Sequence, residues 1–201
     1  MQNLIASKRP LENNMDKYFN ALAPLFPRMT AKQREGVIVL TNTSRFLPLE
    51  QRAYLLATAY HETAFTMQPI VEFGGRKYFD KYDTGRLAEA LGNTPQADGD
   101  GFFFRGRGYV QITGRANYEK AGRKLKIDLV NKPDLALDAR IAADILVKGS
   151  VEGWFTGKKL DDYLNTTRKD YRNARRIING VDKADAIAKY AEVFEQALHQ
   201  L

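Results

Sequence analysis

Two glutamates lie ten residues apart in the stretch AYHETAFTMQPIVEFGG, which runs from residue 59 to residue 75. Glu62 ends an apolar segment with a helical pattern, and Glu72 precedes a Gly-Gly turn. The helix dipole and the loss of water both disfavour a charge at Glu62, so we expect this carboxyl group to keep its proton. A loop carboxylate in water stays ionised, so Glu72 is a candidate base. Two such carboxyl groups across one cleft form the arrangement used to hydrolyse glycosidic bonds.

Each of these features also has a plainer interpretation. Glu62 could be a structural ion-pair partner of Arg105 or Arg107, and Glu72 could simply face solvent. The sequence ADGDG, residues 97–101, has the look of a calcium loop but lacks the remaining ligands, so we interpret it as a turn. The sequence RGRG follows three phenylalanines, a combination that could stack on bases and contact phosphates of a nucleic acid.

Helices must position these groups. The helix that ends at Glu62 is predicted to begin near Pro48, and its apolar residues cover almost every face, which is typical of a buried helix. Thr30 and Gln33 predict a capping box at the start of the helix before it. Further helical patterns indicate a long helix that ends near Gly153 and a last helix with Asp182 as its N-cap.

Glycines interrupt the pattern between residues 67 and 113, and the sequence FFFRGRGYVQIT predicts short strands or an extended hairpin. We therefore expect a mainly α fold of the α+β type, with a small extended insert beside the buried helix. With 201 residues, 44% hydrophobic and 27% charged, the chain suits one domain over residues 29–201. Residues 1–28 are predicted to be an N-terminal extension or the first helix of that domain.

Composition excludes several classes of protein. There is no cysteine and there are only two histidines, so cysteine-based and histidine-rich metal centres are excluded, and we expect no metal site. No apolar run approaches the roughly 20 residues that span a bilayer. The first residues lack the apolar region of a secretory signal. The net charge of +7 favours polyanionic partners such as the anionic bacterial envelope.

Three separated motifs carry a family resemblance: AYHETAF, FRGRGYVQITGRANY and ARRIING. In this order and at these intervals they resemble the catalytic domain of the family 19 glycoside hydrolases, the chitinase group, whose bacterial and phage branch includes lysozyme-like endolysins. The resemblance covers roughly residues 35–200. It implies a lysozyme-like fold with two helical lobes flanking a cleft, and hydrolysis of β-1,4 bonds in N-acetylated amino-sugar polymers with inversion and without a cofactor.

The resemblance also assigns roles to single residues. It places Glu62 at the general acid and Thr113 where the family keeps a hydroxyl that helps to hold the attacking water. Further side chains are expected to contact the sugar: His61, Arg107, Tyr109, Gln111, Asn117 and Asn179.

The base is the point at which this chain departs from the plant members. These carry the second carboxylate on a longer, disulfide-linked loop, whereas here the intervening loop is short and cysteine is absent. Glu72 is the candidate base and Glu89 the fallback. The arginine of the last helix in plant members is replaced near Ala186, so Arg107 is the candidate to support the base.

The leading hypothesis is a monomeric, endolysin-type enzyme that cuts peptidoglycan. It would stay in the cytoplasm of a host bacterium until it is released to the periplasm and the cell wall. Chitin is the alternative substrate. Hypotheses from other classes are an inactive sugar-binding module and a basic nucleic-acid-binding protein; in the leading hypothesis nucleic acid is not a partner.

Overall fold

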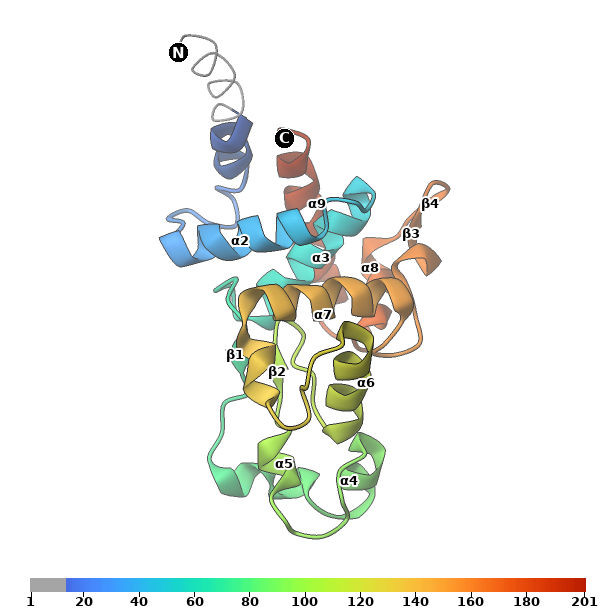
Figure 1. The fold of residues 1–201 in the computed structure, drawn as a ribbon. Coiled ribbons are helices and arrows are strands. Elements are labelled where there is room, and N and C mark those ends of the chain that lie inside the picture. The colour runs from blue at the N-terminus through green and yellow to red at the C-terminus, as the bar shows by residue number, and fades with distance from the viewer. Residues whose placement is uncertain (1–13) are drawn as a thin grey trace.

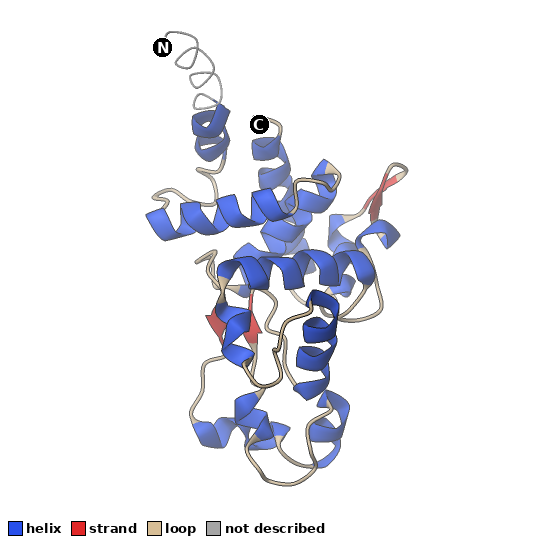
Figure 2. Ribbon diagram, in the orientation of Figure 1, coloured by secondary structure: helices blue, strands red, loops and turns tan. Residues whose placement is uncertain are grey.

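A computed structural model describes residues 14–201 of the protein. Figures 1 and 2 show that helices make up most of this part of the chain and that the strands are short. The mainly helical class expected from the sequence is therefore confirmed. No helix in the described residues has the length and the apolar character needed to cross a membrane.

The helices form two groups (Figure 1). The upper group contains α2 (Ala31–Thr43), α3 (Leu49–Glu62), α7 (Ala139–Glu152), α8 (Tyr171–Ala174) and α9 (Ala184–Leu198). The lower group contains α4 (Gly85–Leu91), α5 (Asp100–Phe103) and the 3-10 helix η1 (Arg76–Tyr82). Helix α6 (Arg115–Leu125) lies between the groups, and the remaining 3-10 turns are η2 (Pro133–Leu137), η3 (Leu160–Asp162) and η4 (Arg175–Ile177).

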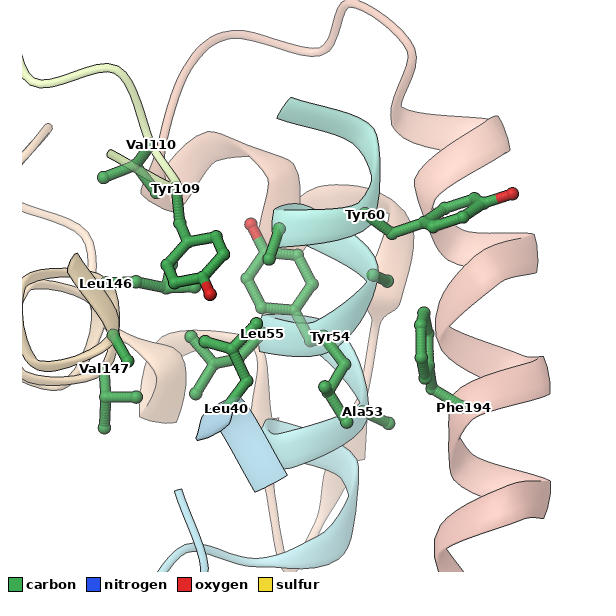
Figure 3. Close-up of a cluster of buried hydrophobic side chains, with 14 of the residues drawn as sticks. Leu40, Ala53, Tyr54, Leu55, Tyr60, Tyr109, Val110, Leu146, Val147 and Phe194 are labelled. Carbon is green, nitrogen blue, oxygen red and sulfur yellow. The ribbon is translucent and has the colours of Figure 1, made fainter. Parts of the chain in front are cut away.

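Helix α3 lies at the centre of the core. It begins directly after Pro48, as predicted, and every residue from Ala53 to Tyr60 is buried. Figure 3 shows Tyr60 against Phe194 of α9 on one side of α3, and Leu55 near Leu146 of α7 on the other. A helix covered on all sides can meet solvent only at its ends, and the last residue of α3 is Glu62, which is partly exposed.

Helix α2 supports the segment that follows Glu62. The predicted capping box of Thr30 and Gln33 is present at its start. The Gln33 amide also donates to the carbonyl oxygen of Phe65, 3.0 Å away, and the Gln68 amide donates to the carbonyl oxygen of Lys32 at 2.6 Å. Two side chains thus tie this segment to α2.

The same segment has an unusual backbone. Ala64, Phe65 and Met67 all have positive φ, between 49° and 69°, a conformation that L-residues other than glycine rarely adopt. Gly36 of α2 makes this path possible, because a Cβ atom there would lie 1.8 Å from the carbonyl oxygen of Met67. The chain after Glu62 therefore passes directly against the α2 backbone.

The glycine-rich insert is only partly extended. Strand β1 (Ile70–Val71) pairs antiparallel with β2 (Arg107–Gly108), and a single bridge joins Arg107 to Ile112. The predicted strand character of the three phenylalanines is wrong, because residues 100–103 form helix α5. Asp100 starts this helix, where a carboxylate is favoured by the helix dipole, and its oxygens pair with Arg115. A second small sheet joins β3 (Leu164–Asn165) to β4 (Arg168–Lys169).

The two predicted helix boundaries in the C-terminal half have different outcomes. Helix α7 ends as predicted at Gly153, which adopts the left-handed conformation. The assignment of Asp182 as the N-cap of the last helix is wrong, because α9 begins at Ala184 after Lys183. The carbonyl oxygen of Asp182 accepts a hydrogen bond from the Arg175 Nε atom at 3.2 Å, so the chain here turns toward Arg175.

Part of the predicted N-terminal extension contributes to the core. Residues 14–21 are helical, and four side chains from residues 14–28 are buried in the main hydrophobic cluster: Tyr18, Phe19, Leu22 and Phe26. The rest of the predicted extension, residues 1–13, lies outside the described residues.

The close approach at Gly36 yields a first prediction. Gly36→Ala places a methyl group against the carbonyl of Met67, so the backbone after Glu62 must move, and we expect the free energy of unfolding to fall by about 1–3 kcal/mol. Gly75→Ala is the matched control, because no heavy atom lies within 4 Å of the added carbon, and its effect should stay within about 0.5 kcal/mol. Chemical denaturation measures both; equal stability of the two variants would contradict the close approach.

Candidate active site

A cleft of about 600 Å³ opens at the end of helix α3. Its walls combine apolar side chains with a small number of polar ones, the usual composition of a ligand site. The lining residues are Glu62, Tyr82, Leu87, Leu91, Val110, Gln111, Thr113, Ile178 and Asn179. Four of the residues predicted for the site from the sequence are therefore brought together here.

Glu62 is held by an arginine that the sequence analysis did not identify. The Arg175 Nη1 atom donates to Glu62 Oε1, and the arginine side chain is only 4% exposed, against 18% for the glutamate. Helix α3 presents the carboxylate at its end, and residues 171–177 (α8 and η4) carry the guanidinium to it. Arg105 and Arg107, the partners considered from the sequence, are not involved.

This ion pair acts against the two effects expected at Glu62. Partial burial and the helix dipole disfavour the anion, but a charged hydrogen bond from a nearly buried arginine favours it. In the described part of the chain no protein donor reaches the second oxygen of Glu62, Oε2. One oxygen is therefore fixed by Arg175, and the other remains available to carry a proton.

Glu72 is not among the residues that line the cleft, but it accepts a hydrogen bond from Tyr82, which lines it, and it has two hydrogen-bond donors of its own. Its Oε1 atom accepts from the Tyr82 hydroxyl at 3.1 Å, and its Oε2 atom accepts from the Gly106 N–H at 3.1 Å. The two donors fix the orientation of the Glu72 carboxyl group. The Glu72 backbone continues the pairing of β1 with β2, because the Glu72 N–H donates to the Gly106 carbonyl at 2.8 Å.

Gln111 and Thr113 form a rigid turn between the two glutamates. The Gln111 backbone has φ of 53°, and its amide nitrogen donates to the carbonyl oxygens of Ile70 and Gly108 at 2.9 and 3.0 Å. Both amide protons are thereby used, so the amide oxygen is the group left to bind a ligand. The Thr113 hydroxyl donates to the Gln111 carbonyl at 3.0 Å, which leaves its lone pairs free to accept from water.

The other predicted contact residues fall into different places. Asn179 is exposed on the wall of the cleft. The Asn117 amide donates to the Thr113 carbonyl at 2.7 Å, so this residue positions the turn that carries Thr113. His61 is half-buried next to Glu62, and its Nδ1 atom is buried without a partner in the described residues.

The structure contradicts the sugar contacts predicted for two residues, Arg107 and Tyr109. Arg107 is 2% exposed and points away from the cleft, because its Nε atom pairs with Asp134 at 2.8 Å and its Nη1 atom donates to the Tyr118 hydroxyl. It therefore supports neither the sugar nor the base. Tyr109 is fully buried, and Figure 3 shows it within the core beside Leu146. Its position after β2 places it on the inner face of the turn that carries Gln111.

The fallback base also lies apart from the cleft lining. Glu89 is exposed on helix α4, whereas Leu87 and Leu91 of the same helix line the cleft. Tyr82 and Arg175 are the functional candidates that the sequence reasoning missed. The motif ARRIING contains Arg175, but only the fold shows which of its two arginines is buried. Nothing in the sequence marks Tyr82.

Within residues 14–201, no group of three or more histidine or carboxylate side chains is arranged to hold a metal ion. The loop at residues 97–101 instead uses its carboxylates internally. Asp83 accepts from the N–H groups of Gly99 and Gly101, and Asp98 accepts from the Thr94 hydroxyl.

The family model described as chitinase class I, of the family 19 glycoside hydrolases, matches residues 48–161, more than half of the chain. The protein belongs to the family 19 glycoside hydrolases. The matched range contains Glu62, Glu72, Gln111 and Thr113, whereas Arg175 and Asn179 lie outside it.

Two curated relatives of this family 19 domain show partial similarity. An acidic endochitinase of Petunia hybrida is 42% identical over 106 residues, which are 53% of this chain and 34% of the relative. A glycosyl hydrolase family 19 domain-containing protein of Haemophilus influenzae is 34% identical over 96 residues, 48% of this chain and 44% of the relative. The match thus spans less than half the length of either protein.

Solved family 19 structures have the same fold. A bacterial family 19 chitinase gives a TM-score of 0.52 with 19% identity, over 89% of this chain and 93% of that one. Chitinase C from Streptomyces griseus gives 0.51 with 16% identity, over 90% of this chain and 75% of that one. At this level of identity the likeness establishes the fold, a mainly helical lysozyme-like architecture.

The ion pair of Arg175 yields a second prediction. Arg175→Gln leaves Glu62 charged, poorly hydrated and unpaired, so the free energy of unfolding at pH 7 should fall by about 3–5 kcal/mol. Adding Glu62→Gln removes the unpaired charge and should recover part of this loss. Arg172→Gln is the control, because its pair with Asp185 is exposed and should contribute at most about 1 kcal/mol. Losses that simply add in the double variant would contradict the coupling.

A third prediction concerns His61. Burial lowers the pKa of His61 below 6.5, and the nearby charges of Glu62, Arg175, Asp182 and Lys183 have smaller effects of both signs. Between this lowered pKa and 6.5, the unfolded chain binds a proton that the folded chain does not. Stability should therefore be complete above pH 6.5 and decrease as the pH falls through that window.

NMR titration of the imidazole protons measures the midpoint directly. The denaturation free energy of His61→Asn should depend less on pH than that of the parent across the same window. A His61 midpoint above 6.5 would show that the neighbouring carboxylate, and not burial, dominates.

Proposed function

We propose that this family 19 domain hydrolyses β-1,4 glycosidic bonds of peptidoglycan by an inverting acid–base mechanism. The observation that carries the proposal is the Glu62 carboxylate, which lies in a cleft of about 600 Å³ with Gln111, Thr113 and Asn179 around it. The apolar walls suit the faces of sugar rings, and the amide and hydroxyl groups suit their N-acetyl and hydroxyl substituents.

In this proposal Glu62 is the general acid. Arg175 holds Oε1, so the orientation of the carboxyl group is fixed before substrate arrives. Oε2 carries the proton to the leaving glycosidic oxygen. A bound glycan excludes water from the cleft, which disfavours the charged form of Glu62 and so favours the protonated acid.

Glu72 is the proposed base. Its carboxylate is oriented by Tyr82 and Gly106, and it would take a proton from the attacking water. Thr113 supports that water: its own proton is donated to the Gln111 carbonyl, so its oxygen accepts from the water. The water's remaining lone pair then faces the anomeric carbon.

Peptidoglycan is the proposed polymer because the protein is positively charged and the bacterial envelope is negatively charged. A net charge of +7 attracts the protein to an anionic envelope and raises its local concentration there. The absence of cysteine means that folding needs no disulfide, which suits an endolysin made in a reducing cytoplasm and released later to the wall. Chitin is the alternative, since the Petunia relative is named an endochitinase.

The mechanism gives a fourth prediction. Glu62→Gln keeps the shape of the side chain but has no proton to transfer, so the hydrolysis rate should fall by roughly 10²–10⁴-fold. Glu72→Gln should cause a loss of similar size, while Glu89→Gln, on the exposed face of α4, should remain near the parent rate. The first product released should be the α anomer, as seen by proton NMR, and the two carboxyl groups should act about 6.5–9.5 Å apart.

Several outcomes would overturn these assignments. If Glu89→Gln is inactive while Glu72→Gln stays active, the base is Glu89 and not Glu72. A β-anomeric first product would exclude inversion. A parent protein that binds glycan without any cleavage would favour the sugar-binding module, and salt-sensitive binding of nucleic acid that ignores Glu62→Gln would favour the nucleic-acid hypothesis.

The substrate gives a fifth prediction. Purified peptidoglycan should be cleaved faster than chitin oligomers, and mass spectrometry of the released fragments identifies the bond that is cut. Lysis of outer-membrane-stripped cells should slow as added salt shortens the Debye length from about 30 to 8 Å. If the protein cleaves chitin efficiently and leaves peptidoglycan strands intact, the substrate is chitin and not peptidoglycan. The acid–base mechanism would still stand.

A further inference from the structure

A second pocket, of about 610 Å³, lies between α5 and η2. In the described residues it shares no lining residue with the cleft around Glu62. The Gly106 N–H donates to Glu72, while the side chain of the neighbouring Arg107, the first residue of β2, pairs with Asp134 in this pocket. We call this pocket the RGRG pocket, after residues 105–108.

The RGRG pocket has an excess of positive charge. Three cationic side chains line it, Arg105, Arg107 and Lys132, and Asp134 is the single acid, so two positive charges remain uncompensated. Arg107 is paired with Asp134, whereas Arg105 and Lys132 have no carboxylate partner in the described part of the chain. Two neighbouring guanidinium groups repel each other, which an anionic ligand would relieve.

Arg105 is already held in a binding conformation. Its guanidinium lies 4.0 Å from the centre of the Phe102 ring, and its Nη1 atom donates to the Phe102 carbonyl at 2.7 Å. Burial lowers the pKa of Arg105, and the charge of Arg107 lowers it further. A planar guanidinium fixed on a ring loses little entropy when it binds a carboxylate with two hydrogen bonds.

Asp134 lets the pocket bind a positively charged group as well. Its Oδ1 atom accepts from the Arg107 Nε atom at 2.8 Å, yet the side chain is 78% exposed, so the other oxygen can accept from a ligand. A pocket that offers two cations without a carboxylate partner in the described residues, beside one unpaired carboxylate oxygen, suits a group carrying both a carboxylate and an ammonium. A neutral sugar needs neither charge, and a run of phosphates would be repelled by Asp134.

We propose that the RGRG pocket binds the peptide stems of peptidoglycan, through their free carboxylate and ammonium groups. The inference rests on the proposed substrate, since chitin carries no peptides. The apolar walls, formed by Phe103, Pro133 and Leu135, contact the aliphatic part of the stem. Binding outside the cleft holds the enzyme on its polymer without touching the reacting bond, so it lowers KM and leaves kcat unchanged.

The test uses stem peptides released from peptidoglycan by an amidase, titrated into the full chain. Arg105→Gln should weaken binding about 10-fold or more, since it removes a charged hydrogen bond. Lys132→Gln should weaken it about 2- to 5-fold, because Lys132 is exposed, and its exposure also means that the variant folds. Lys158→Gln removes the same charge from an exposed position outside the pocket and should bind like the parent.

Kinetics separate this site from the cleft. On intact peptidoglycan Lys132→Gln should raise KM with kcat unchanged, and on glycan strands stripped of peptide by the amidase it should match the parent. An equal loss on stripped strands would overturn the inference, because the pocket would then serve the sugar. Binding of an oligonucleotide as tight as that of the peptide, weakened equally by Lys132→Gln, would overturn it in favour of a phosphate site.

The two proposals fail in distinguishable ways. Cleavage of peptidoglycan without measurable binding of the stem peptide overturns the RGRG pocket and leaves the function standing. Peptide binding that is lost in Arg105→Gln, in a protein that cleaves only chitin, overturns the proposed substrate and leaves the pocket's ligand class in place.

Discussion

The arrangement of this protein follows from one constraint: the middle of helix α3 is apolar on almost every face and must be covered on every side. Its residues from Ala53 to Tyr60 are all buried, and α2, α7 and α9 supply the cover. Only the ends of such a helix can meet solvent, and Glu62 occupies the C-terminal end. The hydrophobic effect that assembles the core thus determines where the carboxylate emerges.

The two carboxylates of the site depend on their hydrogen-bond donors more than on their positions in the fold. A carboxylate at a helix C-terminus, partly removed from water, is unstable unless a partner compensates for both effects. Arg175 does this for Glu62, and the Tyr82 hydroxyl and Gly106 N–H group do it for Glu72. The expected contrast between a glutamate in poor solvent and one in water is replaced by two carboxylates with different, specific donors. The two glutamates differ in their second oxygen: Oε2 of Glu62 has no protein donor in the described residues, whereas both oxygens of Glu72 accept a hydrogen bond.

How much of this could be predicted depends on how local each feature is. The capping box of Thr30 and the start of α3 after Pro48 involve residues a few positions apart, and both were predictable from the pattern. Helix α5 was missed, because the aromatic residues at 102–104 favour strands by propensity while Asp100 and its pair with Arg115 favour a helix start. Local propensity is overridden here by a contact that only the fold creates.

The residues of the site were likewise predictable only where the local sequence marks them. Glu62 stands out because its surroundings in sequence are apolar, and Gln111 and Thr113 stand in a recognisable motif. The side of β2 to which Arg107 points depends on the register of β1 with β2, which a two-residue strand does not encode. Tyr82 meets Glu72 only because η1, which follows the Gly-Gly turn, brings the tyrosine back to the glutamate.

The pair of Glu62 and Arg175 joins residues 113 positions apart in the chain, and this separation bears on how the enzyme comes into existence. Chains are synthesised from the N-terminus, and contacts of long sequence separation form late because loop closure must precede them. Helix α3 is therefore synthesised long before the arginine that pairs with its carboxylate. Arg175 is synthesised long after the residues around Glu62, so a ribosome-bound fragment that ends before Arg175 contains Glu62 but lacks the partner that orients it.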